Sequence, residues 1–423
     1  MKPAMYFRLR RRHAGFNLVE LMVAMTLGLL VSAGIIALFT TTSRTNQVQN
    51  GLARMQENGR FALSRISSDL RMTSAQYCAN TAGTGTLTPN GMQAPLRAPM
   101  LHIRNFTFPD WEGGALSGDT SVPLSPRYFM QGYDCSGTGC APATPAVPSG
   151  IPAAGTAEGS RVRGADILTV RYLRSPGWSV RECNFASKAM TIAPDALSPP
   201  LDIASGDAVL VSDCSNANIF VVAAAGNVVT PTALTGDAQI KCPATASITD
   251  PRIVDGDPRI FNFRKDFVSV TYYLKIRADG NPDRPGRMVP VLVRRESDGT
   301  GMREQELAEG IERLDFLYGI ENAQGQIAFL DAAEVNALTS CPAPPAGVAL
   351  EAGCGWRSVK SIEIHLLLNT VDDIGVAAVD SSFRYSIDGT TIQPPPATLP
   401  SGLSAGRMMR REFVSLVSAR NFQ

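Results

Sequence analysis

Residues 18–39, LVELMVAMTLGLLVSAGIIALF, contain a single ionisable side chain, that of Glu20. About 20 apolar residues at 1.5 Å each cross a hydrocarbon core of roughly 30 Å, so this stretch predicts a membrane-spanning helix. Segment 1–15 before it carries Lys and Arg and no acid. The positive-inside rule then predicts a cytoplasmic N-terminus and an exported chain after about residue 40. A cleaved signal peptide fits poorly, because its apolar region spans only roughly 7 to 15 residues.

Two features within this helix indicate more than a plain membrane anchor. An acid in a membrane helix costs up to about 3 kcal/mol and usually marks function, and Glu20 is such an acid. Small residues recur every four positions at Ala24, Gly28 and Ser32, a spacing that lets helix backbones approach closely. Ordinary membrane composition is the alternative interpretation of this stripe.

Residues 10–30, RRRHAGFNLVELMVAMTLGLL, resemble the class III leader and N-terminal helix of type IV prepilins and type II secretion pseudopilins. The resemblance implies that a prepilin peptidase cuts after Gly15 on the cytoplasmic side and methylates the new terminus, Phe16. It also makes Glu20 the fifth residue of the mature chain, where in this family the acid pairs with the N-terminal amine of a neighbouring subunit and sets the assembly register.

The helix is predicted to continue well beyond the membrane segment. No proline occurs between Pro3 and Pro89, so nothing obliges the helix to break. After Thr42 the apolar residues keep helical spacing, which predicts an amphipathic continuation with one buried face: Val48, Leu52, Met55, Ala62, Ile66 and Leu70, with Gly59 between them. A helix from Phe16 to Tyr77 would be about 93 Å long at 1.5 Å per residue.

The remainder of the chain predicts strands. Residues 268–276 alternate between two faces, which predicts a half-buried strand, and 277–286, RADGNPDRPG, has the composition of a hairpin turn. Further candidate strands are 166–174, 207–213, 218–223, 289–295, 313–320, 360–369 and 411–419. No long amphipathic helices alternate with them, which favours antiparallel pairing.

The expected fold class is therefore α+β and pilin-like. A long N-terminal helix, membrane-spanning in its first half, packs on an antiparallel β-sheet head that carries β-rich and loop insertions. The expected segments are a leader (1–15), a transmembrane helix (16–40), an amphipathic half of the stem (41–77), an irregular Gly- and Pro-rich insertion (78–160), a β-rich head (161–300) and a C-terminal β-rich segment (301–423).

Several dispersed segments resemble the PilW group of minor pilins. They are QENGRFALSRISSDLR at 56–71, GADILTVRYL at 164–173, VLVSDCSNANIFVV at 209–222, IERLDFLYGI at 311–320, VKSIEIHLLLNT at 359–370 and MRREFVSLVSARN at 409–421. The resemblance implies a non-enzymatic filament subunit.

The eight cysteines all follow the apolar segment, and an even number in an exported chain suggests disulfides. Two local pairs are plausible, Cys135 with Cys140 and Cys341 with Cys354. No CxxC pair supports a metal site instead, and the chain has only 3 histidines. We expect His365 to be a solvated sheet residue and His102 to lie in a loop, neither of them a catalytic base.

Motifs for catalysis or for a resident ion are incomplete. Residues 402–406 satisfy G-x-S-x-G, but no histidine follows and the flanking pattern is wrong for a nucleophile elbow. Asp279, Asn281 and Asp283 alternate as in an EF-hand, yet Arg284 and Pro290 stand where Gly and Glu are required. The net charge of +1 gives no reason to expect nucleic-acid binding. No catalytic residue, metal or cofactor is predicted.

The leading hypothesis is a minor type IV pilin that helps to initiate or cap a pilus. Its expected partners are the prepilin peptidase, other minor pilins and the major pilin, the inner-membrane assembly platform and a pilus-tip adhesin. Two alternatives stay open: a minor pseudopilin of a type II secretion system, and a pilus-borne adhesin with binding loops in 80–160 and 320–355.

Overall fold

The structure, a computed structural model, describes most of the chain. The described residues are 17–73, 86–88, 91–93, 99–102, 122–124, 126–137, 139–184, 186–193, 200–212, 217–232, 258–282, 285–297, 301–321, 326–338, 353–372, 385–387, 390–392 and 408–419. Two compact units divide the chain, Met1–Ala53 and Arg54–Gln423. The boundary falls within the first helix.

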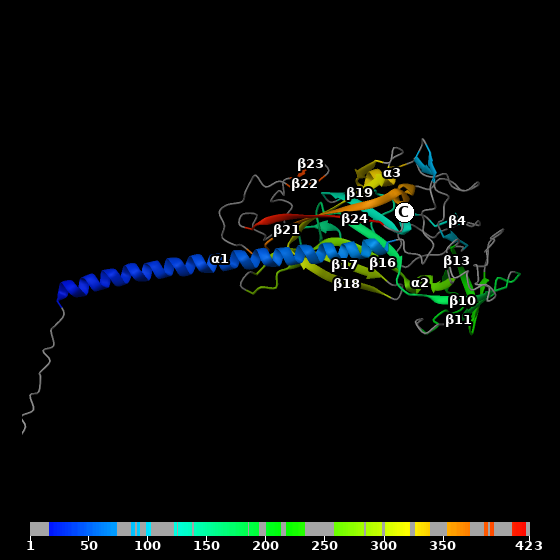
Figure 1. Ribbon diagram of the computed structural model, residues 1–423, viewed down its shortest axis with the longest axis horizontal. Coiled ribbons are helices and arrows are strands. Elements are labelled where there is room, and N and C mark those ends of the chain that lie inside the picture. The colour runs from blue at the N-terminus through cyan, green and yellow to red at the C-terminus, as the bar shows by residue number, and fades with distance from the viewer. Residues whose placement is uncertain are drawn as a thin grey trace, which may run out of the picture. The chain divides into compact units, whose positions relative to one another are not determined.

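That helix, α1 (Leu18–Met72), has 55 residues and is about 83 Å long at 1.5 Å per residue. It begins where Leu21 N donates to Asn17 O, 3.1 Å away. It ends at Met72, five residues before the predicted end at Tyr77. There the hydroxyl of Thr73 donates to the carbonyl of Asp69 over 3.3 Å, and the Thr73 amide donates to Leu70 O in a tightened last turn. The single long helix is confirmed (Figure 1).

The first sheet of the second unit is predominantly antiparallel. Its strand order is β18 (Met302–Glu309), β17 (Met288–Ser297), β16 (Phe267–Ala278), β9 (Ile167–Leu173), β5 (Met130–Ser136) and β6 (Gly139–Ala141). The short β8 (Arg161–Val162) pairs with β16 and with β7 (Ala154–Gly155). The hairpin predicted over 277–286 is confirmed, because β16 and β17 pair antiparallel across it from Ala278 and Met288. Strand β5 lies within the segment expected to be irregular, 78–160, and joins this sheet directly.

A second antiparallel sheet has the order β20 (Ile327–Leu330), β19 (Ile311–Glu321), β21 (Val359–Asn369) and β24 (Arg410–Ser418). A buried carboxylate links the two sheets. Asp166 accepts a hydrogen bond from Cys135 N of β5 at 2.9 Å and another from Phe316 N of β19 at 3.0 Å. Burial, together with the neighbouring Asp315 and Asp134, raises the pKa of Asp166 well above its ordinary value.

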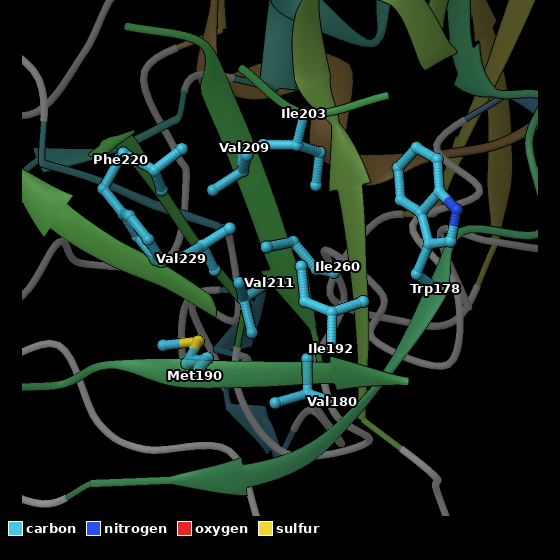
Figure 2. Packing of buried hydrophobic residues seen from close by; sticks show 11 residues of the cluster. Trp178, Val180, Met190, Ile192, Ile203, Val209, Val211, Phe220, Val229 and Ile260 are labelled. Carbon is cyan, nitrogen blue, oxygen red and sulfur yellow. The ribbon is translucent and has the colours of Figure 1, made fainter. Parts of the chain in front are cut away.

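A third set of strands closes on itself as a small barrel. The ring runs β12 (Ala208–Ser212), β15 (Arg259–Asn262), β10 (Trp178–Cys183), β11 (Met190–Ala193), β14 (Val228–Thr232), β13 (Ala217–Ala225) and back to β12, with every pairing antiparallel. Figure 2 shows its apolar interior, filled by side chains such as Trp178, Phe220 and Ile260. The sequence predicted two of these strands but not the ring.

Short elements complete the described head. Strand β3 (Met100–Leu101) pairs with β13 and with β4 (Val122–Pro123). Two small hairpins pair β1 (Thr86–Thr88) with β2 (Gly91–Gln93) and β22 (Tyr385–Ile387) with β23 (Thr390–Ile392). The short helices are η1 (Pro126–Tyr128), α2 (Phe263–Asp266), α3 (Ala332–Ala337) and η2 (Cys354–Ser358). Asp331 and Glu334 form a capping box at the start of α3.

One expectation about burial is wrong. Strand β16 was predicted to be half-buried, yet both Tyr272 and Tyr273, which point to opposite faces, are fully buried. The reason is that both faces are covered. Tyr272 meets α1 on one side, and Tyr273 packs with Tyr133 and Val293 on the other. The α+β class, with a long apolar helix and a mainly antiparallel β domain, is confirmed.

Candidate functional site: the stem helix and its anchor

The first half of α1 is an apolar surface. Residues 17–47 are all exposed, and large side chains such as Leu18, Leu29 and Phe39 are each more than 70% accessible. The helix contains an 18-residue window with mean hydropathy 2.4 and no buried share. By length and composition it can cross a membrane. Soluble proteins rarely leave such a surface uncovered, so lipid or other apolar helices are its expected surroundings.

Glu20 lies in the first turn of α1 and is exposed. A carboxylate there is favoured by the unpaired amides and the positive end of the helix dipole. Its side chain projects from the helix and remains available to a cation supplied by another molecule. Residues Gly15 and Phe16, the predicted cleavage and methylation site, lie outside the described residues.

The small-residue stripe forms a shallow face on the same half of the helix. Ala24, Gly28 and Ser32 are exposed. No described residue comes within 4 Å of a Cβ placed at Gly28 on that face. A second apolar helix would therefore find room for close backbone contact there.

Hydroxyl groups on this half are satisfied within the helix. Thr26 donates to Val23 O at 2.9 Å, and the hydroxyls of Thr40, Thr41, Thr42 and Thr45 donate likewise to carbonyls three or four residues earlier. Such bonds lower the cost of placing threonine in hydrocarbon or against another apolar helix. These hydroxyl bonds were not predicted, although the sequence shows a TTT run at the end of its apolar stretch.

The second half of α1 has a buried face instead. Met55, Ala62, Ile66 and Leu70 are each at most 2% exposed, which confirms the amphipathic continuation predicted by their spacing. Gly59 interrupts this stripe, because a Cβ there would lie 2.9 Å from the ring of Phe413 on β24. The absence of a side chain at Gly59 thus permits close contact between helix and strand.

A buried ionic group lies at the end of this face. We name it the anchor cluster: Asp69 of α1, Tyr172 of β9 and Arg174 just after β9, Tyr272 of β16, and Arg294 and Glu296 of β17. Asp69 Oδ2 accepts hydrogen bonds from Arg294 Nε at 2.6 Å and from Tyr272 OH at 2.5 Å. Its other oxygen accepts from Tyr172 OH at 3.0 Å. Three strands thereby hold one carboxylate of the helix.

The charges of the anchor cluster balance. Arg294 also donates to Glu296, and Arg174 Nη2 lies 2.5 Å from the same carboxylate. Burial alone would raise the pKa of Glu296, but its hydrogen bonds to Arg294 and Arg174 outweigh burial and lower it. Burial, reinforced by Asp69, raises the pKa of Tyr272, so its hydroxyl stays a donor. A compensated group of this kind fixes geometry more than it adds stability.

A further polar contact forms earlier in the same helix. Asn58 Nδ2 donates to the carbonyl of Glu309 on β18 at 3.2 Å. The segment from Asn58 to Asp69 is therefore bonded to the first sheet at both ends. Neither contact was predicted, although an acid beside a stripe of Ile66 and Leu70 was a detectable signal.

The side chains of His102 and His365 are both buried. His365 was expected to be solvated, but it is only 6% exposed, since Glu363 and Glu412 bond its two ring nitrogens at 2.9 and 3.1 Å. His102 lies outside any helix or strand, directly after β3, as expected, but it is buried. It bonds Asn218 Oδ1 at 3.0 Å, and burial lowers its pKa, partly offset by that bond.

The structure joins Cys135 and Cys140 by a disulfide across the β5–β6 turn. Cys183 is also disulfide-bonded. Cys354 begins η2, whereas Cys341, Asp283 and the G-x-S-x-G segment at 402–406 lie outside the described residues. Among the residues that the structure does describe, no group of three His, Cys, Asp or Glu side chains is placed to hold a metal ion.

Two family models match this chain. Residues 10–36 match the prokaryotic N-terminal methylation motif, and residues 271–421 match PilW, the type IV pilus-assembly protein W. The chain is therefore similar to PilW over its C-terminal part and to type IV prepilins at its N-terminal motif. The first match contains Glu20 and the small-residue stripe, and the second contains Tyr272, Arg294 and Glu296 of the anchor cluster. The barrel belongs to neither matched segment. Searches of curated proteins and of solved structures find no match to this chain.

Proposed function

We propose that this chain is a minor type IV pilin that helps to initiate or cap a pilus and that acts by packing rather than by catalysis. The observation that carries the proposal is the division of α1. An exposed apolar half bears Glu20 and belongs to a methylation motif. The following segment is bonded to a head whose C-terminal part matches a pilus-assembly family. A subunit of a helical filament needs both properties.

In the proposed sequence of events, prepilin peptidase removes residues 1–15 and methylates Phe16. The stem then waits in the inner membrane, as a single pass with a cytoplasmic N-terminus and a periplasmic head. Assembly on the inner-membrane platform moves it into a bundle of stems at the cell surface. Glu20 pairs there with the N-terminal amine of a neighbour, and Ala24, Gly28 and Ser32 permit close approach.

Mass spectrometry of the mature N-terminus tests the processing step. The expected product begins at Phe16 and carries one N-methyl group. A protein that keeps Met1, or one cut near residue 40, would contradict the prepilin assignment.

The minor pseudopilin of a type II secretion system remains the second candidate, because its leader has the same pattern. The family model that matches residues 271–421 describes a type IV pilus-assembly protein, which favours the pilus over the secretion system. Deletion of the gene separates the two. Loss of surface pili and twitching supports the proposal, whereas loss of exoprotein secretion with intact pili overturns it.

A further inference from the structure

Strands β9 and β16 are neighbours in the first sheet, yet the chain between them leaves the sheet and builds the barrel. Leu173 and Phe267 are Cα partners in the ladder, and Arg174 N donates to Asp266 O at 3.0 Å. The chain therefore departs and returns at adjacent points. That geometry is what an inserted module requires, because the host strands can pair whether or not the insertion is present.

The strands of the barrel pair with one another in a ring, and β13 also pairs with β3 at Asn218 and Ile219. Its six strands close a complete ring, so β12 pairs with β13 on one side and with β15 on the other. A closed ring leaves no strand edge that must be covered by the host sheets.

The barrel also has its own hydrophobic core, to which all six strands contribute. Every second residue points inward, as Val209 and Val211 do on β12 and Phe220 and Val222 do on β13. Figure 2 shows Val209, Val211 and Phe220 together with Val180, Met190, Ile192 and Val229 from the other strands. No residue of this cluster comes from the two host sheets.

Ring contacts and hydrogen bonds join the barrel to its surroundings. Phe263 of α2, just after β15, stacks on Phe267 at 4.6 Å between ring centroids. On the far side, β3 pairs with β13 over two residues, and His102 bonds Asn218. These contacts orient the barrel but do not complete its core.

From this closure, the separate core and the adjacent exit and return, we propose that residues 175–265 are a separately folding module inserted into the pilin head. The insertion point lies beside the last turn of α1, because Tyr172 bonds Asp69 there. The module can be gained or lost without changing the stem, the anchor cluster or the host sheets. The proposal concerns folding and does not depend on the pilus function.

A deletion tests whether the host needs the module. Residues 175–265 are replaced in the full-length protein by Asn-Gly, because Arg174 and Asp266 occupy the flanking positions of a two-residue hairpin loop. A second version carries a longer Gly-Ser loop. Hydrogen exchange in detergent is expected to retain slow amides in β16, β17, β19 and β21 in at least one version. Loss of that protection in both versions would overturn the proposal.

Matched point variants test the same claim in the intact chain. The rings of Phe220 in the barrel and Phe316 in the second sheet are both at most 2% exposed. Phe220→Ala therefore opens a cavity in the barrel, and Phe316→Ala opens one at the second sheet. Phe220→Ala should speed amide exchange in β10–β15 about a hundredfold, with the host strands unchanged. Phe316→Ala should do the reverse. If either variant speeds amide exchange in the barrel and in the host sheets by the same factor, barrel and host form one cooperative unit and the proposal fails.

Discussion

The two halves of α1 share one continuous helix but face different surroundings. From Leu18 to residue 47 every side chain is exposed, apolar residues surround the helix, and Glu20 is the one acid. From Met55 to Leu70 a single face is buried, and the acid beside it, Asp69, is held by Arg294 and two tyrosines. The carboxylate of Asp69 thus has its counter-charge inside the chain. The carboxylate of Glu20 has none among the described residues of the first unit. An acid with an intramolecular partner therefore marks the part of a stem that is fixed to its own head. An acid without such a partner marks the part that contacts other subunits.

Asp69→Ala breaks the anchored half most strongly. It leaves the Arg294 guanidinium buried beside hydroxyls that lose their acceptor, and removing one partner of a buried pair costs about 3–5 kcal/mol. Denaturant unfolding of the detergent-solubilised protein measures this loss. The control is Asp202→Ala, which breaks the exposed pair with Lys265 and should cost at most about 1 kcal/mol. A loss in Asp69→Ala no larger than in this control would mean that the anchor cluster does not hold the helix.

Gly59→Leu sharpens the comparison by adding bulk where helix and strand touch. The new side chain meets the Phe413 ring and should cost about 1–3 kcal/mol through overpacking, partly offset by better helix propensity. Gly28→Leu is the matched variant on the other half, where an added Cβ meets no described atom within 4 Å. It should leave the free energy of unfolding unchanged or higher in the same assay. Equal losses at both glycines would contradict the contrast between the halves.

Acid should weaken the anchored half. The pKa of Glu296 lies below its ordinary value of 4.5 in the folded protein, because its bonds to Arg294 and Arg174 outweigh burial. A lowered folded-state pKa gives stability that is complete above that ordinary value and is lost as pH falls through the folded value. The parent should therefore lose more unfolding free energy than Glu296→Gln between about pH 6 and about pH 3. Identical pH profiles for the two proteins would contradict this assignment.

Local patterns predicted much of this fold. Apolar length predicted α1, three-or-four spacing predicted its buried face, and alternation predicted the β16–β17 hairpin. These signals arise within short windows, where spacing alone decides which side chains share a face. The family resemblance added Gly15 and Phe16 as expected processing residues and an assembly role for Glu20, which periodicity could not have supplied.

Long-range pairings were beyond such reasoning. Asp69 and Arg294 are 225 residues apart, and nothing near either residue identifies its partner. Barrel closure depends on β15 pairing with both β10 and β12, which no local period encodes. The burial of both faces of β16 and of His365 likewise depends on layers formed by distant segments.

The proposed assembly depends most on Glu20, and incorporation of variants into sheared filaments tests its role most directly. Glu20→Ala should reach the membrane at the parental level and be strongly depleted from filaments, because neighbouring stems lose the acid that pairs with their N-terminal amine. Glu57→Ala, which removes an exposed acid from the anchored half of the same helix, should be incorporated like the parent. Parental incorporation of Glu20→Ala would contradict the central claim that this carboxylate directs assembly.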